Sequence, residues 1–522
     1  MPILHEISLI MKKTLTLLSL TVLLFGSSCS VSQKNTSIKD DGKIEIVFVQ
    51  VNDVYEIAPL GGGKEGGIAR VASLKKQEKE KNTNTFLVMG GDFVSPSIYN
   101  SLKYEGKSIR GKQMIEALNA AEMDFVVFGN HEFDIKEAEL QSRIDESEFT
   151  WVASNTFHKS GSTIQPFTMN STTPFPETYI LNVTDADGTK AKIGIIGITL
   201  PFNKVPYVHY TDPITTAKRL YAEIKDSVDI VIALTHLDIK DDIKLAQEIP
   251  TLGLIMGGHE HDMQFEKVGD VYITKAHANA KTAYVNTLRL DKKNGTLKVF
   301  PKLEYLNENI ALDNHTNTVV EKWVKIANEN YNSLGFDAED IVIAKSEPLE
   351  GRETVIRSQP SNLTELVVRG VHAAAPLSDV VLVNAGAIRV DDILHAPVSQ
   401  YDILRAMPFG GEIREVDMTG SFLSKILDVG ESNKGIGGYL LRNSTVMKMN
   451  DKWVIGEDTI DNSKVYRVAM LGFLLTGMES NLDFLKEDNP GIVKLYPIET
   501  SSDHPQSDIR LALVHYLKSV NN

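Results

Sequence analysis

The sequence predicts an α/β protein with two domains joined by a helix. Over residues 43–305, short apolar runs rich in Val and Ile alternate with amphipathic helical stretches, which is the pattern of an α/β domain. A polar segment with helical periodicity follows at residues 306–335, and strand-like and helical runs resume over residues 336–522. We therefore expect a first α/β domain, a linker helix and a second, smaller α/β domain.

The overall composition excludes some classes of protein. The 522 residues are 42% hydrophobic and 24% charged, which is ordinary for a folded protein with two or three cores. Lys and Arg number 54 against 69 Asp and Glu, giving a net charge of −15. This balance argues against a surface that binds a nucleic acid polymer or anionic lipid. An anionic substrate would need local arginines or metal ions.

The N-terminal segment, residues 1–29, has the features of an export signal. From Met11, the expected true start, two lysines precede an apolar core that is too short to span a bilayer, and small residues follow up to Cys29. Cys29 is the only cysteine and stands where a bacterial lipoprotein signal is cut and acylated, although Gly26 replaces the usual leucine. We favour a lipid anchor at Cys29 over a cleaved secretory peptide. The expected location is extracytoplasmic, in the periplasm or cell envelope.

The elements of the first domain can be taken in order. The strand-like runs are IEIVFVQV, NTFLVMGGD, FVVFGNHE, AKIGIIGIT, DIVIALTH and LGLIMGGHEH, and the clearest helix is IARVASLKKQEKEK. GGGKEGG before that helix lacks the serine or threonine of a nucleotide-binding P-loop, so we interpret it as a turn. In the second domain, DVVLVNAG and YRVAMLGFLL predict strands, and DIRLALVHYLKS predicts a terminal helix.

Several strand-like runs of the first domain end at potential metal ligands. These residues are Asp53, Asp92, Asn130, His131, His236, His259 and His261. In an α/β sheet, groups beyond the carboxyl ends of the strands gather at one place, so these side chains should converge. Carboxylates, an amide and imidazoles suit Mn, Fe, Zn or similar ions, and do not suit calcium cages or thiolate zinc sites.

The order of these motifs resembles the calcineurin-like metallophosphoesterases over about residues 43–305. The resemblance implies a four-layer α/β/β/α sandwich and two divalent or mixed-valence metal ions, such as Mn, Zn, Fe or Co. It implies that Asp53, Asp92 and His261 hold the first ion, and that Asp92, Asn130, His236 and His259 hold the second. His131, oriented by Asp134, would be the catalytic dyad beside the scissile phosphate. Two such ions hold the attacking and leaving oxygens of an in-line displacement.

Tyr55 departs from the family pattern. The first motif of the family is usually Asp-x-His, and its histidine ligates the first metal, whereas here Tyr55 stands at that position. On a strand, Asp53 and Tyr55 would project to the same face. Two interpretations stay open: the phenol is a ligand that favours a hard ion such as ferric iron, or it packs nearby and a water fills the gap. Loss of activity is less favoured, because every other ligand and the dyad remain.

The second domain carries motifs suited to a nucleotide. Arginines bind phosphate as planar forks, and two phenylalanines can sandwich a flat ring. GRETVIR, NAGAIR, MPFGG and GFLLTGMES make the chain similar to the 5'-nucleotidase family over both domains. The resemblance implies that Arg352, Arg357 and Arg389 contact anionic groups, Asn384 and Gly386 line the pocket, Phe409 and Phe473 stack on the base, and Glu479 takes the place of a ribose-binding aspartate. It also implies that the second domain swings on the linker helix to carry the substrate to the metal ions.

Together these features predict a dinuclear metal hydrolase that removes the 5'-phosphate of nucleotides outside the cytoplasm, for salvage. Hydrolysis of UDP-sugars, dinucleotides or 2',3'-cyclic nucleotides is the enzymatic alternative. A nucleotide-binding lipoprotein without catalysis is the alternative of a different class.

Overall fold

The computed structural model describes residues 40–499, 501 and 503–521, so the predicted signal segment and Cys29 lie outside the described residues. The chain divides into two units. The described part of the smaller unit is Asp40, Asp41 and residues 186–188, and within it the backbone N–H of Asp41 donates to Oδ2 of Asp187 (2.8 Å). The larger, Gly42–Asp185 with Thr189–Asn522, contains both α/β domains. Among the described residues, every helix is too short or too polar to span a bilayer.

Two six-stranded sheets form the centre of the first domain. The first sheet has the order β19-β18-β1-β2-β5-β6, with β1 at Lys43–Val51, β2 at Thr85–Met89, β5 at Phe125–Val126, β6 at Thr150–Trp151, β18 at Thr282–Asp291 and β19 at Thr296–Tyr305. The second has the order β11-β12-β14-β15-β17-β16, with β11 at Thr178–Thr184, β12 at Lys190–Thr199, β14 at Ile230–His236, β15 at Ile255–Met256, β16 at Gln264–Val268 and β17 at Val271–Lys275.

The alternation of side chains along β1 shows how the sheets pack. Ile46 and Phe48 point to one face and join a buried cluster with residues of the second sheet, such as Ile232. Val47 and Val49 point to the other face and join the cluster beneath the helices. Successive side chains of a strand alternate between faces, so an uninterrupted apolar run is required where both faces are covered.

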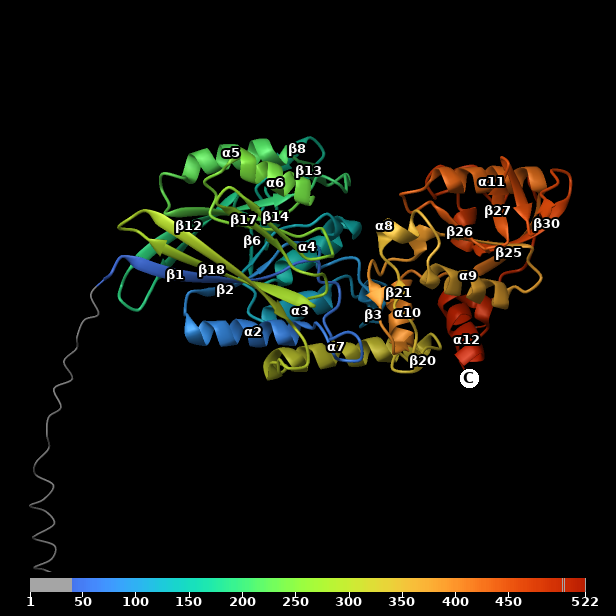
Figure 1. Ribbon diagram of the computed structural model, residues 1–522, viewed down its shortest axis with the longest axis horizontal. Coiled ribbons are helices and arrows are strands. Elements are labelled where there is room, and N and C mark those ends of the chain that lie inside the picture. Colours follow the sequence, from blue (N-terminus) through green and yellow to red (C-terminus); the bar gives the residue numbers. More distant parts are fainter. Residues whose placement is uncertain (1–39, 500, 502, 522) are drawn as a thin grey trace, which may run out of the picture. The chain divides into compact units, whose positions relative to one another are not determined.

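Helices cover the outer faces of both sheets (Figure 1). The helices on the first sheet are α2 at Ile68–Lys81, α3 at Lys112–Ala120 and α4 at Glu137–Glu146, and those on the second are α5 at Pro213–Ile224 and α6 at Ile239–Glu248. The α2 helix spans the predicted run, and Arg70 in its first turn donates to the carbonyls of Gly63 and Gly66, which fixes the glycine-rich turn. The four-layer α/β/β/α sandwich is therefore confirmed.

Shorter elements complete the first domain. They are η1 at Ile98–Ser101, β3 at Lys103–Tyr104, β4 at Lys107–Ser108, η2 at His131–Asp134, β7 at Thr156–Ser160, β8 at Thr163–Gln165, β9 at Thr168–Met169, β10 at Thr173–Pro174 and β13 at Val208–Tyr210. Among these, η2 carries the predicted catalytic dyad within a single turn.

The linker helix α7 runs from Asn314 to Ser333 and lies along α2 and α3 (Figure 1). Its N-cap Asp313 accepts a hydrogen bond from the N–H of Thr316 (3.0 Å), which satisfies one of the free amides of the first turn. Trp323 of α7 is fully buried, and its indole N–H donates to Glu116 of α3 (2.9 Å). The helix is therefore part of the first domain's packing as well as a connection.

The second domain is built on a five-stranded sheet with the order β26-β22-β30-β25-β31. These strands are β22 at Val380–Asn384, β25 at Ile413–Thr419, β26 at Leu440–Arg442, β30 at Val465–Leu471 and β31 at Ile492–Leu495. One face packs on α9 (Asn362–Ala374) and α12 (Ile509–Asn521), and the other on α11 (Gly420–Ser432). The remaining elements are β20 at Ile341–Ile343, β21 at Leu349–Glu350, α8 at Glu353–Ile356, η3 at Ala385–Ala387, β23 at Ile393–Leu394, β24 at Val398–Ser399, α10 at Gln400–Ala406, β27 at Val446–Met449, β28 at Lys452–Ile455, β29 at Asp458–Thr459, η4 at Gly472–Leu475 and η5 at Pro505–Ser507.

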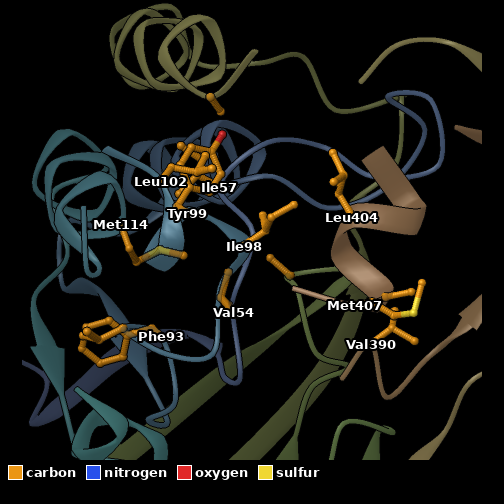
Figure 2. Packing of buried hydrophobic residues seen from close by; sticks show 14 of the residues in the cluster. Val54, Ile57, Phe93, Ile98, Tyr99, Leu102, Met114, Val390, Leu404 and Met407 are labelled. Atoms are coloured by element: carbon orange, nitrogen blue, oxygen red, sulfur yellow. The ribbon is translucent and has the colours of Figure 1, made fainter. Parts of the chain in front are cut away.

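One apolar cluster continues from the first domain into the second. Figure 2 shows Val54 and Ile98 of the first domain near Val390, Leu404 and Met407 of the second, and all five are buried in the same cluster. Burial of apolar surface stabilises such an arrangement by about 25 cal/mol per Å². The segment around Val390 is thereby held against the loops that follow β1 and β2.

Candidate metal centre and active site

The predicted ligands gather at the carboxyl ends of strands from both sheets. Asp53 follows β1, Asp92 follows β2, and His236 ends β14. Ligand atoms of these three residues lie within 4.8 Å of one another, and all three side chains are buried. Asn130, after β5, places its Oδ1 3.2 Å from Nε2 of His236. These four side chains therefore converge as predicted.

This donor set fits a cation. Nδ1 of His236 donates to the carbonyl of Gly90 (2.7 Å), so Nε2 faces Oδ2 of Asp92 at 3.1 Å. A histidine held in this way presents an unprotonated nitrogen to a metal. Burial lowers the pKa of His236, but Asp92 and Asp53 raise it to about 9. Two buried carboxylates beside an imidazole nitrogen are the environment in which a divalent ion replaces a proton.

The backbone at the two aspartates is specialised. Asp53 and Asp92 have left-handed φ angles of +52° and +54°, a region that few residues other than glycine adopt. A Cβ at Gly129 would lie 2.0 Å from Oδ1 of Asp92, so only glycine allows these two loops to approach. The glycines preceding the predicted ligands are therefore explained by close packing.

Glu132 is a residue of the site that the sequence reasoning missed. Its carboxylate is buried and accepts hydrogen bonds from the backbone N–H groups of Asp92, Phe93, Val94 and Gly129. Burial, followed by the charge of Asp92, raises its pKa to about 7. Its place in GNHE was the available signal, but a sequence does not distinguish an exposed carboxylate from one that ties two loops together.

The two histidines after β15 lie around Asp53. The N–H of His259 donates to Oδ2 of Asp53 (2.9 Å), while its Nε2 lies 3.3 Å from Oδ1 of Asp238. Nε2 of His261 lies 3.7 Å from Oδ1 of Asp53. Burial lowers the pKa of His261, but Asp391 and Asp53 raise it to about 10. Asp238 and Asp391 were not among the predicted site residues.

The side chain of Tyr55 points into this group of ligands. Its hydroxyl lies 3.4 Å from Oδ1 of Asp53 and 3.0 Å from Nε2 of His261. The strand β1 ends at Val51, before both residues. The expectation that Asp53 and Tyr55 share a strand face is therefore wrong, and a turn at Asp53 brings the two side chains together. Burial, with Asp92 and Asp53, raises the pKa of Tyr55, so without a cation it is a neutral phenol.

His131 and Asp134 form a close pair. Nδ1 of His131 lies 2.7 Å from Oδ2 of Asp134, and the N–H of His131 donates to Oδ1 of Asp92 (2.8 Å). Burial lowers the pKa of His131, but Asp92 and Asp134 raise it above its usual value. Asn203, which the sequence reasoning missed, donates to Oδ1 of Asp134 (2.6 Å) and to the carbonyl of Asn130 (2.9 Å).

A cavity of about 310 Å³ joins this centre to the second domain. Its walls include Tyr55, Asp92 and His131 of the first domain and Arg352 and Arg389 of the second. Arg357 is not among the residues that line this cavity, but it pairs with Glu353, whose Oε1 is 3.3 Å from Nη1 of Arg389. Two predicted anion-binding arginines therefore share a cavity with predicted metal ligands, and the third is connected to them through Glu353.

The other predicted pocket residues form two groups. Nδ2 of Asn384 donates to Glu479 (2.7 Å), and the N–H of Gly386 donates to the carbonyl of Gly437 (2.7 Å). Phe409 precedes β25 and Phe473 follows β30, and these strands pair with Ile413 opposite Leu471. The phenylalanines are 69% and 44% exposed, so both rings are accessible at the same end of the sheet.

Family comparisons agree with this geometry. Residues 46–263 match the model of the calcineurin-like phosphoesterases, and residues 342–487 match the model of the 5'-nucleotidase C-terminal domain. The chain is therefore a metal-dependent phosphoric ester hydrolase of the calcineurin-like class. Because it also carries the second domain, it belongs to the 5'-nucleotidase family, as the motifs predicted.

Individual relatives are distant. Protein UshA of Yersinia enterocolitica is 24% identical over 503 residues, covering 84% of this chain and 86% of that protein. The trifunctional nucleotide phosphoesterase YfkN of Bacillus subtilis is 24% identical over 442 residues, which are 76% of this chain but 28% of that protein's length. The crystal structure of a 5'-nucleotidase precursor from Thermus thermophilus has 20% sequence identity and a TM-score of 0.65, covering 92% of this chain and 97% of that one. This last likeness concerns the fold.

Proposed function

We propose that this protein removes the 5'-phosphate from nucleoside monophosphates. The observation that carries the proposal is the shared cavity, in which Arg352 and Arg389 face Asp92 and His131. Arginine forks bind phosphate, and a metal centre with an adjacent proton donor hydrolyses phosphate esters. The matched family models and relatives named as nucleotidases support this assignment.

Two ions of the Mn, Zn, Fe or Co type fit the donor set. Asp53, Asp92, His261 and Tyr55 would hold the first, and Asp92, Asn130, His236 and His259 the second, with Asp92 shared. When bound, such ions act as Lewis acids on a phosphoryl oxygen and lower the pKa of water. The phenol of Tyr55 lies close to two of these ligands, which supports its role as a ligand.

The protein's own residues would orient the ester and supply a proton. Asp134 holds Nδ1 of His131, which leaves the other ring nitrogen for the substrate. His131 would then stabilise charge on the phosphate or protonate the leaving oxygen, a role that contributes ~100-fold to ~10,000-fold. Arg352, Arg357 and Arg389 would fix the anionic groups, and Phe409 and Phe473 would stack on the base beside Asn384, Gly386 and Glu479.

We place this activity outside the cytoplasm, in nucleotide salvage. The proposal rests on the export-like segment before Cys29, with a lipid anchor at that residue as the favoured attachment. Palmitate labelling of the chain in a bacterial host, with Cys29→Ala as the control, tests the anchor. Labelling of both forms, or of neither, would contradict it.

The direct test is phosphate release from AMP. The protein is expressed from the full-length sequence, purified as the host processes it, stripped with a chelator and refilled with Mn, Zn, Co or iron. We expect turnover only after refilling, its loss in Asp92→Asn, and slow turnover with metal retained in His131→Ala. Full activity in either variant would overturn the mechanism.

Parallel assays define the substrate. UDP-glucose, a dinucleotide and 2',3'-cyclic AMP are tested beside AMP under the same conditions. A preference for one of these over AMP would replace the proposed substrate but keep the hydrolase. Binding of AMP without turnover of any of them, at every metal, would favour a nucleotide-binding protein that lacks catalysis.

A further inference from the structure

One aspartate of the second domain contacts a predicted metal ligand of the first. Oδ2 of Asp391 accepts a hydrogen bond from Nδ1 of His261 (2.8 Å). The same side chain reaches in another direction, since Oδ1 accepts from the N–H of Glu353 (2.6 Å). Glu353 follows Arg352 directly, at the start of the helix that leads to Arg357. A single carboxylate therefore connects the histidine with the arginine-bearing loop.

The opposite side of the His261 ring faces the metal centre. Nε2 lies 3.0 Å from the hydroxyl of Tyr55 and 3.7 Å from Oδ1 of Asp53. A histidine that gives one ring nitrogen to a metal commonly donates its other N–H to a carboxylate, which fixes the orientation of the ring and strengthens the ligand. Here that carboxylate comes from another domain, 130 residues further along the chain.

The backbone around Asp391 is held in place. Asp391 has a left-handed φ of +39°, and the preceding Val390 is buried in the apolar cluster that spans both domains (Figure 2). The following Asp392 accepts two hydrogen bonds from Lys281 (2.7 and 2.6 Å) and lies 3.5 Å from Arg405. The Asp391 carboxylate is thus presented to His261 by a segment that is anchored on both sides.

We propose that Asp391 is a positioning residue that orients His261 toward the first metal ion and ties it to the arginine loop, so that the metal site and the phosphate site form together. The role given to the arginines rests on the proposed function. The orientation of His261 does not depend on that function, because it affects metal affinity alone. Because linkage is reciprocal, phosphate bound at the arginines should raise the affinity for the first ion, and the first ion should raise the affinity for phosphate by the same factor.

The test measures metal binding directly. Mn²⁺ is titrated into the chelator-stripped protein by calorimetry, for the wild type and for Asp391→Ala. Loss of such an outer carboxylate typically weakens metal binding about 10-fold to 100-fold. We expect a loss of that size at one of the two sites, with the other site unchanged. Affinity within about threefold of the wild type at both sites would overturn the proposal.

Asp392→Asn is the matched control. It removes the neighbouring charge and weakens the pair with Lys281, but leaves the Asp391 contact with His261. We expect metal affinities close to those of the wild type. An equal loss in both variants would show that metal affinity depends on the packing of the whole segment and not on the contact between Asp391 and His261. That result would also overturn the proposal.

A double-mutant cycle gives a second, independent outcome. If Asp391 acts through His261, then Asp391→Ala should have no further effect on metal affinity in a His261→Ala background. Additive losses would overturn the proposal. Circular dichroism and melting curves of each variant verify folding. Because these readouts need no turnover, a failure here is distinguishable from a failure to hydrolyse AMP.

Discussion

The hydroxyl of Tyr55 lies 3.0 Å from Nε2 of His261, on the side of the ring opposite Asp391. Tyr55 stands where relatives of this class usually have a histidine ligand. The turn after β1 brings the phenol beside Asp53 and His261. These contacts support our proposal that Tyr55 supplies an oxygen donor to a bound metal ion.

The first prediction concerns the metal preference set by Tyr55. We expect the wild type loaded with ferric iron to show a visible absorption band from tyrosinate-to-iron charge transfer, because a hard cation displaces the phenolic proton. Tyr55→Phe should lose the band and bind iron more weakly, and Tyr55→His should shift preference toward Zn or Co. A band that persists in Tyr55→Phe would contradict ligation by this residue.

The second prediction concerns Glu132, which accepts hydrogen bonds from backbone amides of both glycine-containing loops. Glu132→Gln should lower the free energy of unfolding by about 2–5 kcal/mol, because its NH₂ group would face buried donors and leave them unpaired. Urea denaturation of the metal-free protein measures this. Glu223→Gln, at an exposed ion pair with Arg219, should cost no more than about 1 kcal/mol. Equal effects of the two substitutions would contradict the role of Glu132.

The third prediction concerns Asn203, which holds Asp134 and the backbone of Asn130. Asn203→Ala should lower kcat because Asp134 loses the hydrogen bond that holds it in place beside His131. We expect a decrease of about tenfold, which is smaller than the effect of removing a proton-transfer residue. Metal content and KM should change little. The control is Tyr210→Phe, since the Tyr210 hydroxyl donates to the backbone carbonyl of Asn203 and not to its side chain. A kcat of Asn203→Ala equal to that of the control would refute this role.

The fourth prediction concerns the attachment of the linker helix. Oε2 of Glu116 accepts from the indole N–H of Trp323 (2.9 Å) and from Nζ of Lys322 (2.6 Å). Glu116→Gln should destabilise the protein by about 1–2 kcal/mol at neutral pH, because a charge-assisted bond is replaced by a neutral one. Glu321→Gln, on the exposed face of the linker helix α7, should change the stability little.

The same contact predicts a pH dependence. Burial raises the pKa of Glu116, but hydrogen bonds from Lys322 and Trp323 outweigh it, so the folded-state pKa lies below the usual value. A carboxylate of this kind stabilises the fold above its unfolded pKa, and the gain is lost as the pH falls through the folded pKa. The stability difference between wild type and Glu116→Gln should be constant from about pH 6 to 8 and shrink below about pH 4. A difference that grows on acidification would contradict this assignment.

Much of the fold was predictable because it depends on local patterns. Nearly continuous apolar runs mark β1 and β14, a run of helical period marks α2, and the predicted bounds of α2 agree with the structure. The order of the ligand motifs also indicated that Asp92 and His236 would meet, since the carboxyl ends of parallel strands share one edge. These features depend on periodicity and spacing, which a single chain displays.

The supporting contacts were not predictable in the same way. Glu132 binds the loop of Asp92, Asn203 binds Asp134, and Asp391 binds His261 across two domains. Each is a polar residue whose neighbours come from a distant part of the chain, so its local sequence does not differ from that of an exposed residue.

The residues and their resemblance to a known family were enough to predict the class of the protein, the layers of its first domain and the chemical types of its candidate metal ligands. Three relationships became visible only in the folded chain: Tyr55 faces His261, Arg352 and Arg389 share a cavity with His131, and the Asp391 carboxylate of the second domain contacts His261 of the first. The physical reason is that periodicity is a property of neighbouring residues, whereas side-chain hydrogen bonds depend on distances that exist only after the sheets, helices and loops have packed together.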